Sequence, residues 1–291
     1  MQLPDLYQAI LARRSVRQYE RQSLNEAMLA QVQAGISAVQ PLVPENEFWA
    51  PQRDDVLRAD LVSILGAYGH LVTPPHAIVP YAVGQVYVLE DLGYRTQQIV
   101  VHLTRLGIAS CYIGTLTHEN EARTRFSLPE GARIGALLVF GYAATGVGGR
   151  ALNALVRTVA GATHRLPLES IFFEDDFQQP TSPPQWLQAA RFAPSACNAQ
   201  PWRFLWQAGQ LHLFVTRHNR RYGKGASQAY CLYDAGICMA NVVLALQAFG
   251  LSVRWSMYQP GEIGDVPTHP ADLRPIARLK LPAGDLADKL G

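Results

Sequence analysis

Lysine is nearly absent from this sequence. Lys224, Lys280 and Lys289 are the only lysines in 291 residues, so arginine carries almost all of the positive charge. The formal net charge is +2, too close to neutral to favour nucleic acid or an anionic membrane as a partner. The planar guanidinium group of arginine can donate two parallel hydrogen bonds to an oxyanion such as a phosphate or a carboxylate. Two interpretations stay open here: a bias in codon usage, or selection for oxyanion binding.

The chain also has few cysteines and no long apolar run. Its four cysteines form no C-x-x-C pair and no zinc-like spacing with the eight histidines, so we predict reduced thiols in an intracellular protein and no metal site. The first 17 residues contain an acid and arginines where a signal peptide needs an apolar core. No apolar run approaches the ~20 residues of a membrane helix. We therefore predict a cytoplasmic protein that binds no membrane.

An internal repeat divides the sequence. Residues 89–114 (LEDLGYRTQQIVVHLTRLGIASCYIG) align without a gap with residues 232–257 (LYDAGICMANVVLALQAFGLSVRWSM), at an offset of 143. The later segment ARIGALLVFG, from Ala132, pairs with ARLKLP, from Ala277, at an offset of 145. We predict two units of about 145 residues, 1–149 and 150–291, with the Gly-rich segment 144–150 between them.

Periodicity and turn residues predict the main elements of each unit. Apolar residues from Leu3 to Leu11 at helical spacing predict a helix that ends at Arg13 and Arg14. In the second unit we expect a helix over 182–194, capped by Ser182, and then a hairpin over 202–216 around Ala208–Gly209. The repeated segments 89–114 and 232–257 contain the longest predicted helices.

The helix within 232–257 is apolar on nearly every side, so it must be buried on every side. Packing of the two long helices against each other at the centre would explain this burial and would make the repeats halves of an internal pseudo-dimer. Residues 132–143 would form a core strand of the first half, and residues 276–282 its shorter counterpart. The predicted class is α+β, with antiparallel or mixed sheets.

Four segments together resemble the nitroreductase family of flavoproteins. They are RRSVRQY at the end of the first helix, the turn APSACNAQPWRF (193–204), the D-x-G start of the long helix and LGIASCYIG (106–114). The chain resembles most closely the branch in which two nitroreductase-like units are fused in tandem. In homodimeric members, each flavin lies between the arginine motif of one subunit and the polar turn of the other.

The two repeats have lost complementary parts of this pattern. The first keeps RRSVR but has AVQPLVPENEFWAPQ in place of the polar turn; the second keeps PSACNAQPW but has HRLPLESIFFEDD in place of the arginine motif. The resemblance therefore implies one bound FMN per chain, with the second pseudo-symmetric site degenerate. Its predicted contacts come from both halves: Arg13, Arg14, Ser15, Arg17, Ile113, Gly114 and Arg150 from the region up to residue 150, and Pro194, Ser195, Ala196, Asn198 and Gln200 from the turn.

The resemblance also implies a reaction. Arginine forks would bind the FMN phosphate and the charge that develops near N1 on reduction, and the backbone at Ile113 and Gly114 would approach N5. NAD(P)H would reduce FMN and leave, and a nitroaromatic, quinone or related acceptor would then take the electrons in the same cleft. This scheme needs no catalytic side chain. Fused halves remove the need for a homodimer, so we expect a monomer.

Several alternatives stay open on the sequence. The protein could be a flavin-binding or flavin-free structural pseudo-enzyme. Gly146–Ala151 also satisfies the G-x-G-x-x-A pattern of a Rossmann-type NAD(P)-binding enzyme, although a Pro-rich segment and a hairpin follow it instead of alternating strands and helices. Cys197, within the polar turn, is either a small buried cysteine or a redox thiol, and we predict the buried cysteine. The segment HNRRYGKG (218–225) is either a solvated basic loop or a binder of nicotinamide-cofactor phosphates.

Overall fold

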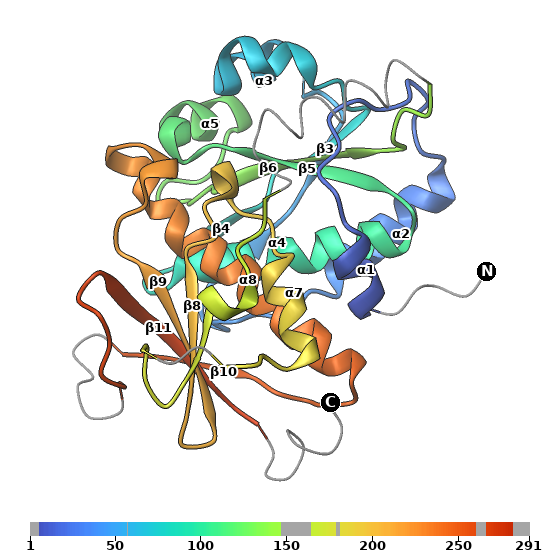
Figure 1. The fold of residues 1–291 in the computed structure, drawn as a ribbon. Helices are drawn as coiled ribbons and strands as arrows, with labels where there is room; N and C mark the ends of the chain where they lie inside the picture. The colour runs from blue at the N-terminus through green and yellow to red at the C-terminus, as the bar shows by residue number, and fades with distance from the viewer. Residues whose placement is uncertain (1–5, 57, 147–163, 179–180, 260–265, 282–291) are drawn as a thin grey trace.

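The computed structural model describes residues 6–56, 58–146, 164–178, 181–259 and 266–281 (Figure 1). Its α-helices are α1 Leu6–Ala12, α2 Glu26–Ser37, α3 Arg58–Leu65, α4 Val88–Arg105, α5 Glu119–Phe126, α7 Gln188–Arg191 and α8 Tyr230–Ala248. Its strands are β1 Glu47–Trp49, β2 Gln52–Arg53, β3 His76–Ile78, β4 Tyr81–Val83, β5 Ala109–Gly114, β6 Ala136–Gly141, β7 Phe172–Glu174, β8 Trp202–Gln207, β9 Gln210–Thr216, β10 Trp255–Met257 and β11 Leu273–Lys280. The class is α+β, as predicted.

Two main sheets lie at opposite ends of the molecule, with α4 and α8 between them (Figure 1). The first has the order β2-β3-β6-β5 and is antiparallel throughout; the second has the order β10-β11-β9-β8-β7, with β7 and β8 parallel. The expected core strand is β6, and all six of its residues are buried. The expectation of a shorter counterpart near the C-terminus is wrong: β11 has eight residues, because it pairs along almost the whole of β9.

The first sheet also weakens the Rossmann alternative. Strand β6, which precedes Gly146, runs antiparallel to both of its neighbours. A Rossmann unit needs parallel strands joined by crossover helices. The rest of the predicted fingerprint, 147–151, lies outside the described residues.

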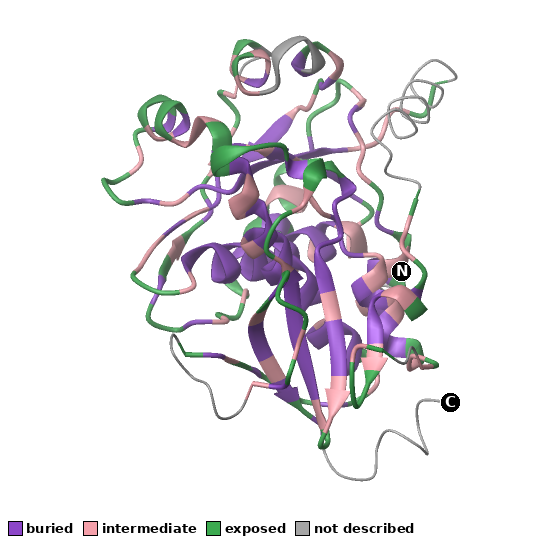
Figure 2. Ribbon diagram, turned by 60° about the vertical axis from the view of Figure 1, so that its left-hand side comes forward, coloured by how far each residue is buried: buried purple, intermediate pink, exposed green. Residues whose placement is uncertain are grey.

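Helices α4 and α8 pack against each other through a reciprocal pair of glycines. A Cβ atom on Gly93 would overlap the carbonyl oxygen of Tyr233, and one on Gly236 would overlap the carbonyl oxygen of Glu90. The offset of 143 relates Glu90 to Tyr233 and Gly93 to Gly236, so the same contact is made twice with the helices exchanged. This reciprocity is the geometry that a pseudo-twofold axis between two halves would produce. Figure 2 shows this helical centre as a continuous buried region.

Local signals placed the first helix and the hairpin correctly. Helix α1 ends at Ala12, directly before the arginine motif, and β8 and β9 form the predicted hairpin. Its turn residues, Ala208 and Gly209, have φ angles of 50° and 74°, as a tight two-residue hairpin turn requires.

The helix expected over 182–194 is wrong at its start. Pro184 is extended (φ −65°, ψ 150°) and occupies the N-cap, so Ser182 does not cap the helix. A short 3₁₀ turn, Gln185–Leu187, leads directly into α7. Tandem prolines explain the late start, because a proline disfavours the helical conformation of the residue before it.

One continuous helical stretch, Gly225–Ala248, is long and apolar enough to cross a membrane by length and composition alone. Within the protein, 83% of its most apolar window is buried. It is therefore the central helix of the fold, and its apolar character is explained by packing on all sides.

Candidate functional site

The arginine motif of the first half lies beside the start of β5. Ser15 forms an isolated parallel bridge with Ser110, and the Val16 backbone N–H donates to the Ser110 carbonyl at 3.1 Å. The Arg13 guanidinium is buried and donates to Ser15 Oγ at 3.3 Å. Arg13 and Arg17 both lie near the Cys111 thiol and act to lower its pKa, although burial raises it overall. Arg13, Ser15 and Arg17 are thus gathered at one strand.

The polar turn of the second half has an unusual backbone. Cys197, Asn198 and Gln200 have φ angles of 51°, 52° and 47°, in the left-handed region that side chains other than glycine rarely adopt. The Ser195 hydroxyl accepts a hydrogen bond from the Gln200 backbone N–H at 3.0 Å and closes the turn. Such conformations persist only where the surroundings hold them, and they occur often at ligand sites.

An aspartate at the start of each long helix holds the turn of its own half. In the second half, Asp234 accepts from the Ala196 backbone N–H at 2.9 Å and from the Tyr222 hydroxyl at 2.8 Å. In the first half, the equivalent Asp91 accepts from the backbone N–H groups of Leu42 and Val43, at 2.8 and 3.1 Å. The D-x-G pattern therefore contains an acid that fixes the turn.

The two aspartates differ in charge compensation. Arg95, four residues after Asp91, binds both carboxylate oxygens at 3.0 Å. The corresponding position after Asp234 is Cys238, which carries no charge. Asp234 is 1% exposed, and burial raises its pKa to about 8 even though its two hydrogen bonds act in the opposite direction.

Arg165 connects the two halves of the predicted site, and sequence reasoning missed it. It donates to the Ala193 carbonyl at 2.8 Å and to Asn198 Oδ1 at 3.1 Å. Burial, followed by the nearby guanidinium groups of Arg13, Arg14 and Arg191, lowers its pKa to about 10. It therefore lies between the arginine motif of the first half and the turn of the second. The signal was present in HRLPLE, the counterpart of the arginine motif, which retains this one arginine.

These four arginines form a cationic cluster with no acid in it. No salt bridge among the described residues involves Arg13, Arg14, Arg165 or Arg191. The pKa of Arg13 is also lowered to about 10, mainly by burial, and its buried Nε has no hydrogen-bond partner among the described residues. Arg14 and Arg191 each lie over the Phe192 ring, at 5.9 Å from its centroid. Arg13 is buried, Arg165 and Arg191 are half-buried and Arg14 is exposed, and none of them has an acidic partner among the described residues. Such partly buried positive charge without a counter-ion fits an anionic ligand.

The amide side chains of the turn are already engaged within the protein. Asn198 Nδ2 and Gln200 Nε2 both donate to the His164 carbonyl, at 2.6 and 3.1 Å, and Gln200 Oε1 accepts from the Leu166 backbone N–H at 2.9 Å. These bonds tie the turn to residues 164–166, which carry Arg165. Asn198 and Gln200 thus position the turn relative to the cationic cluster, and Pro194 is buried beside them.

The remaining predicted contacts lie at the end of β5 or outside the described residues. Ile113 is buried in the core and pairs with Leu137, and Gly114 pairs with Ala136. A Cβ atom on Gly114 would overlap the hydroxyl of Tyr230, which accepts from the Leu116 backbone N–H at 3.1 Å. The close approach that this glycine allows is thus made here by Tyr230. Arg150 lies outside the described residues.

The prediction that Cys197 is buried is wrong. Its residue is exposed at the tip of the turn, because the left-handed backbone there directs it away from the core. Partial burial of the thiol together with the nearby Asp234 carboxylate raises its pKa, so it is protonated near neutral pH and is not an activated thiolate.

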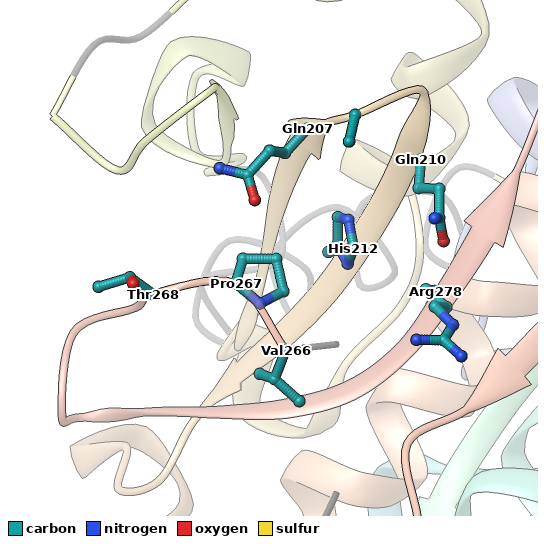
Figure 3. Close-up of a pocket in the computed structure, with 8 residues that line it drawn as sticks. Gln207, Gln210, His212, Val266, Pro267, Thr268 and Arg278 are labelled. Carbon is teal, nitrogen blue, oxygen red and sulfur yellow. The ribbon is translucent and has the colours of Figure 1, made fainter. Parts of the chain in front are cut away.

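A hollow of about 520 Å³ lies at the far end of the β8–β9 hairpin (Figure 3). It is lined by Gln207, Ala208, Gln210, His212, Val266, Pro267, Thr268 and Arg278. Gln207 lies five positions after Trp202, which is next to the turn, and this is a distance of about 17 Å along a strand. None of the predicted site residues lines this hollow. Burial, followed by the nearby Arg278 guanidinium, lowers the pKa of His212.

Comparison with known families decides the relationship. A family model described as "Putative TM nitroreductase" matches residues 5–224. The chain belongs to this nitroreductase family. The match includes the arginine motif, Arg165 and the polar turn, so it covers every residue of the cationic cluster. No curated protein matches the chain.

One solved structure shows the same fold over the whole chain. It is described as a "putative nitroreductase" from Thermotoga maritima MSB8 and is 17% identical, with a TM-score of 0.57, and the match covers 97% of this chain and 95% of that one. An NADH dehydrogenase/NAD(P)H nitroreductase structure from Bacteroides thetaiotaomicron is 22% identical (TM-score 0.41; 48% of this chain, 88% of that one). An FMN-dependent nitroreductase from Clostridium difficile R20291 is 20% identical (TM-score 0.38; 46% and 85%). The Thermotoga match extends over nearly the whole of both chains.

Proposed function

We propose that this protein is an FMN-dependent NAD(P)H oxidoreductase that passes electrons to a nitroaromatic, quinone or related acceptor. One FMN per chain would bind between the arginine motif of the first half and the polar turn of the second. The observation that carries this proposal is the acid-free cluster of Arg13, Arg14, Arg165 and Arg191 beside the turn. FMN fits it because the phosphate is an anion and the ring gains negative charge on reduction.

Each half would contribute a different part of the site. Arg13, Arg14 and Arg165 would supply fixed positive charge, which stabilises an oxyanion without reorganisation when charge develops. Ser195, Asn198 and Gln200 hold the turn in its left-handed conformation, so its backbone would be preorganised toward the cofactor. Bound FMN would supply the ring that accepts hydride from the nicotinamide and then gives up electrons to the acceptor.

A second candidate, a flavin-free structural protein, is favoured by one observation. The Asn198 and Gln200 amides already have partners in residues 164–166, so the turn is satisfied without a ligand. On this alternative the cationic cluster would bind another small anion or none.

The compartment and the oligomeric state complete the proposal. All four cysteines are free, which supports a reducing compartment such as the cytoplasm.

The reciprocal packing of α4 and α8 supports the division into two fused halves, 1–149 and 150–291, and with it a monomer. Light scattering of the purified protein would give the molecular mass in solution. A stable dimer would show that fusion of the halves has not replaced a subunit interface.

The test is the amount of FMN per chain. The visible spectrum of the purified protein, followed by heat release and quantitation of the flavin, should give close to one FMN per chain. Arg13→Ala and Arg165→Ala should each weaken FMN binding about 10- to 100-fold, the value of a hydrogen bond to a charged group. Arg254→Ala, an exposed arginine beyond the C-terminal end of α8, is the matched control.

The outcomes separate the candidates. A folded protein that is colourless and cannot be reconstituted with FMN would favour the structural alternative. Two flavins per chain would still agree with an FMN-dependent enzyme, but they would contradict the inference that each repeat has lost one part of the flavin-binding pattern. Circular dichroism of each variant would show whether a loss of flavin is only a loss of fold.

A further inference from the structure

The segment HNRRYGKG, residues 218–225, forms a strongly basic loop on the surface. Arg220, Arg221 and Lys224 are all exposed. No salt bridge within the described part of the chain pairs any of them with an acid. In a chain with a net charge of only +2, three uncompensated cations within five residues are a local excess of positive charge.

One end of this basic loop is fixed at the polar turn by two direct hydrogen bonds and by a third that passes through Asp234. Asn219 Nδ2 donates to the Ala199 carbonyl at 3.1 Å, and Arg221 Nη1 donates to the Cys197 carbonyl at 3.4 Å. The Tyr222 hydroxyl donates to Asp234, the same carboxylate that holds the Ala196 N–H of the turn. The cations are therefore presented directly beside the turn.

The other end of the basic loop reaches the end of β5. A short 3₁₀ segment, Gly225–Ala229, packs against the 3₁₀ turn Leu116–His118 that follows β5, and leads into α8. At the start of α8, the Tyr230 hydroxyl lies against Gly114. The basic loop thus spans the two places where the proposed flavin would be contacted, the turn and the strand end at Ile113 and Gly114.

We propose that Arg220, Arg221 and Lys224 bind the 2′-phosphate of NADPH and make NADPH the preferred electron donor. This proposal rests on the proposed function, because it takes the donor to approach the flavin between the turn and β5. A phosphate monoester carries about −1.5 to −2 charges at pH 7, and arginine forks match its geometry. NADH has a neutral hydroxyl at the same position and would gain nothing from the cations.

Binding of two fragments tests the proposal without relying on turnover. Isothermal titration calorimetry on the protein as purified would compare adenosine 2′,5′-bisphosphate with 5′-AMP, which lacks the 2′-phosphate. We expect the bisphosphate to bind at least about tenfold more tightly at low salt, and the preference to fall as ionic strength rises. Equal affinity for the two fragments would overturn the proposal.

Substitutions in the basic loop test whether its cations cause the preference for the bisphosphate. Arg220→Ala and Lys224→Ala keep the three hydrogen bonds that fix the loop to the turn, so they change charge and not position. Each should reduce the preference for the bisphosphate about tenfold, while Arg254→Ala, at the other end of α8, should leave it unchanged. The 19 residues of α8 make it about 28 Å long; the loop precedes its start, and Arg254 follows its end. Loss of the preference in the control alone, or in no variant, would contradict the assignment.

Flavin reduction distinguishes failure of this proposal from failure of the proposed function. Stopped-flow reduction of FMN-loaded protein should be faster with NADPH than with NADH, and Arg220→Ala should bring the two rates together. A flavin that both donors reduce equally well in the wild type would refute the NADPH preference and leave the proposed function intact. Preference for the bisphosphate in a protein that cannot hold FMN would support the loop as a phosphate site and remove the proposed function.

Discussion

Replacing Asp234 with asparagine should change how the stability of the protein depends on pH. Asp234 is buried beneath the polar turn, where it accepts hydrogen bonds from the Ala196 N–H and the Tyr222 hydroxyl. Arg95 compensates Asp91 in the first half, whereas the corresponding position after Asp234 is the uncharged Cys238, and no salt bridge within the described ranges involves Asp234. The Asp234→Asn variant keeps an acceptor oxygen for the same hydrogen bonds but cannot titrate.

The sign and size follow from the two pKa values of Asp234. Burial raises its pKa in the folded protein to about 8, against the ordinary aspartate value of 3.8, which we take for the unfolded chain. Between these values the folded protein keeps a proton that the unfolded chain releases, so the stabilising contribution is complete below about pH 4 and is lost as pH rises toward 8. The slope is up to about −1.4 kcal/mol per pH unit in the free energy of unfolding. From pH 5 to pH 7 this amounts to about 3 kcal/mol.

Urea denaturation of both proteins at pH 5, 6 and 7, followed by tryptophan fluorescence, measures the effect. The difference in unfolding free energy between Asp234→Asn and the wild type should grow with pH in favour of the variant, and other titrating groups cancel in this difference. Asp91→Asn is the control: it leaves buried Arg95 without its carboxylate and should lose about 3–5 kcal/mol. Equal pH slopes for Asp234→Asn and the wild type would refute the reasoning that Asp234 is protonated in the folded state.

Three further substitutions test the helix packing, the hairpin turn and the Tyr222–Asp234 hydrogen bond. Gly236→Ala places a methyl group on the Glu90 carbonyl and should cost about 1–3 kcal/mol or more in urea denaturation; an unchanged midpoint would mean that α4 and α8 do not pack as closely as described. At Gly209 an added Cβ would contact no other atom, but alanine would have to adopt a φ of 74°. Gly209→Ala should therefore lower the free energy of unfolding by about 1–2 kcal/mol in the same assay. Tyr222→Phe removes a hydrogen bond that lowers the pKa of Asp234, so the pH-dependent loss of stability should extend to higher pH; an unshifted window would contradict that bond.

Much of the fold was predictable because its signals are local. The spacing of apolar residues placed α1, α4 and α8, and the Ala208–Gly209 turn placed the hairpin. One error came from a local signal that was not weighed, the tandem prolines, and the other from strand pairing that is distant in the sequence. Tandem prolines moved the start of the helical segment that contains α7 to Gln185, and pairing with β9 made β11 longer than the sequence predicted.

The candidate site was predictable in outline and not in detail. The arginine motif and the polar turn were found because each is a contiguous pattern. Arg165 was missed because HRLPLE is degenerate as a motif, and only the packing brings its one arginine against Arg13 and Arg14. The exposure of Cys197 depends on a left-handed backbone that the sequence around it does not announce.

By itself, the sequence determined the first helix, the two long helices, the β8–β9 hairpin and the core strand β6, and it identified the two motifs through which the chain resembles flavoproteins. The tertiary structure alone decided how charges are distributed between the halves: among the described residues, four arginines share a site without an acid, Asp91 is paired with Arg95, and buried Asp234 has no cationic partner. The physical reason is one of range. Backbone conformation follows from neighbours along the chain, whereas the energy of a charge depends on which groups and how much solvent surround it after the halves have packed.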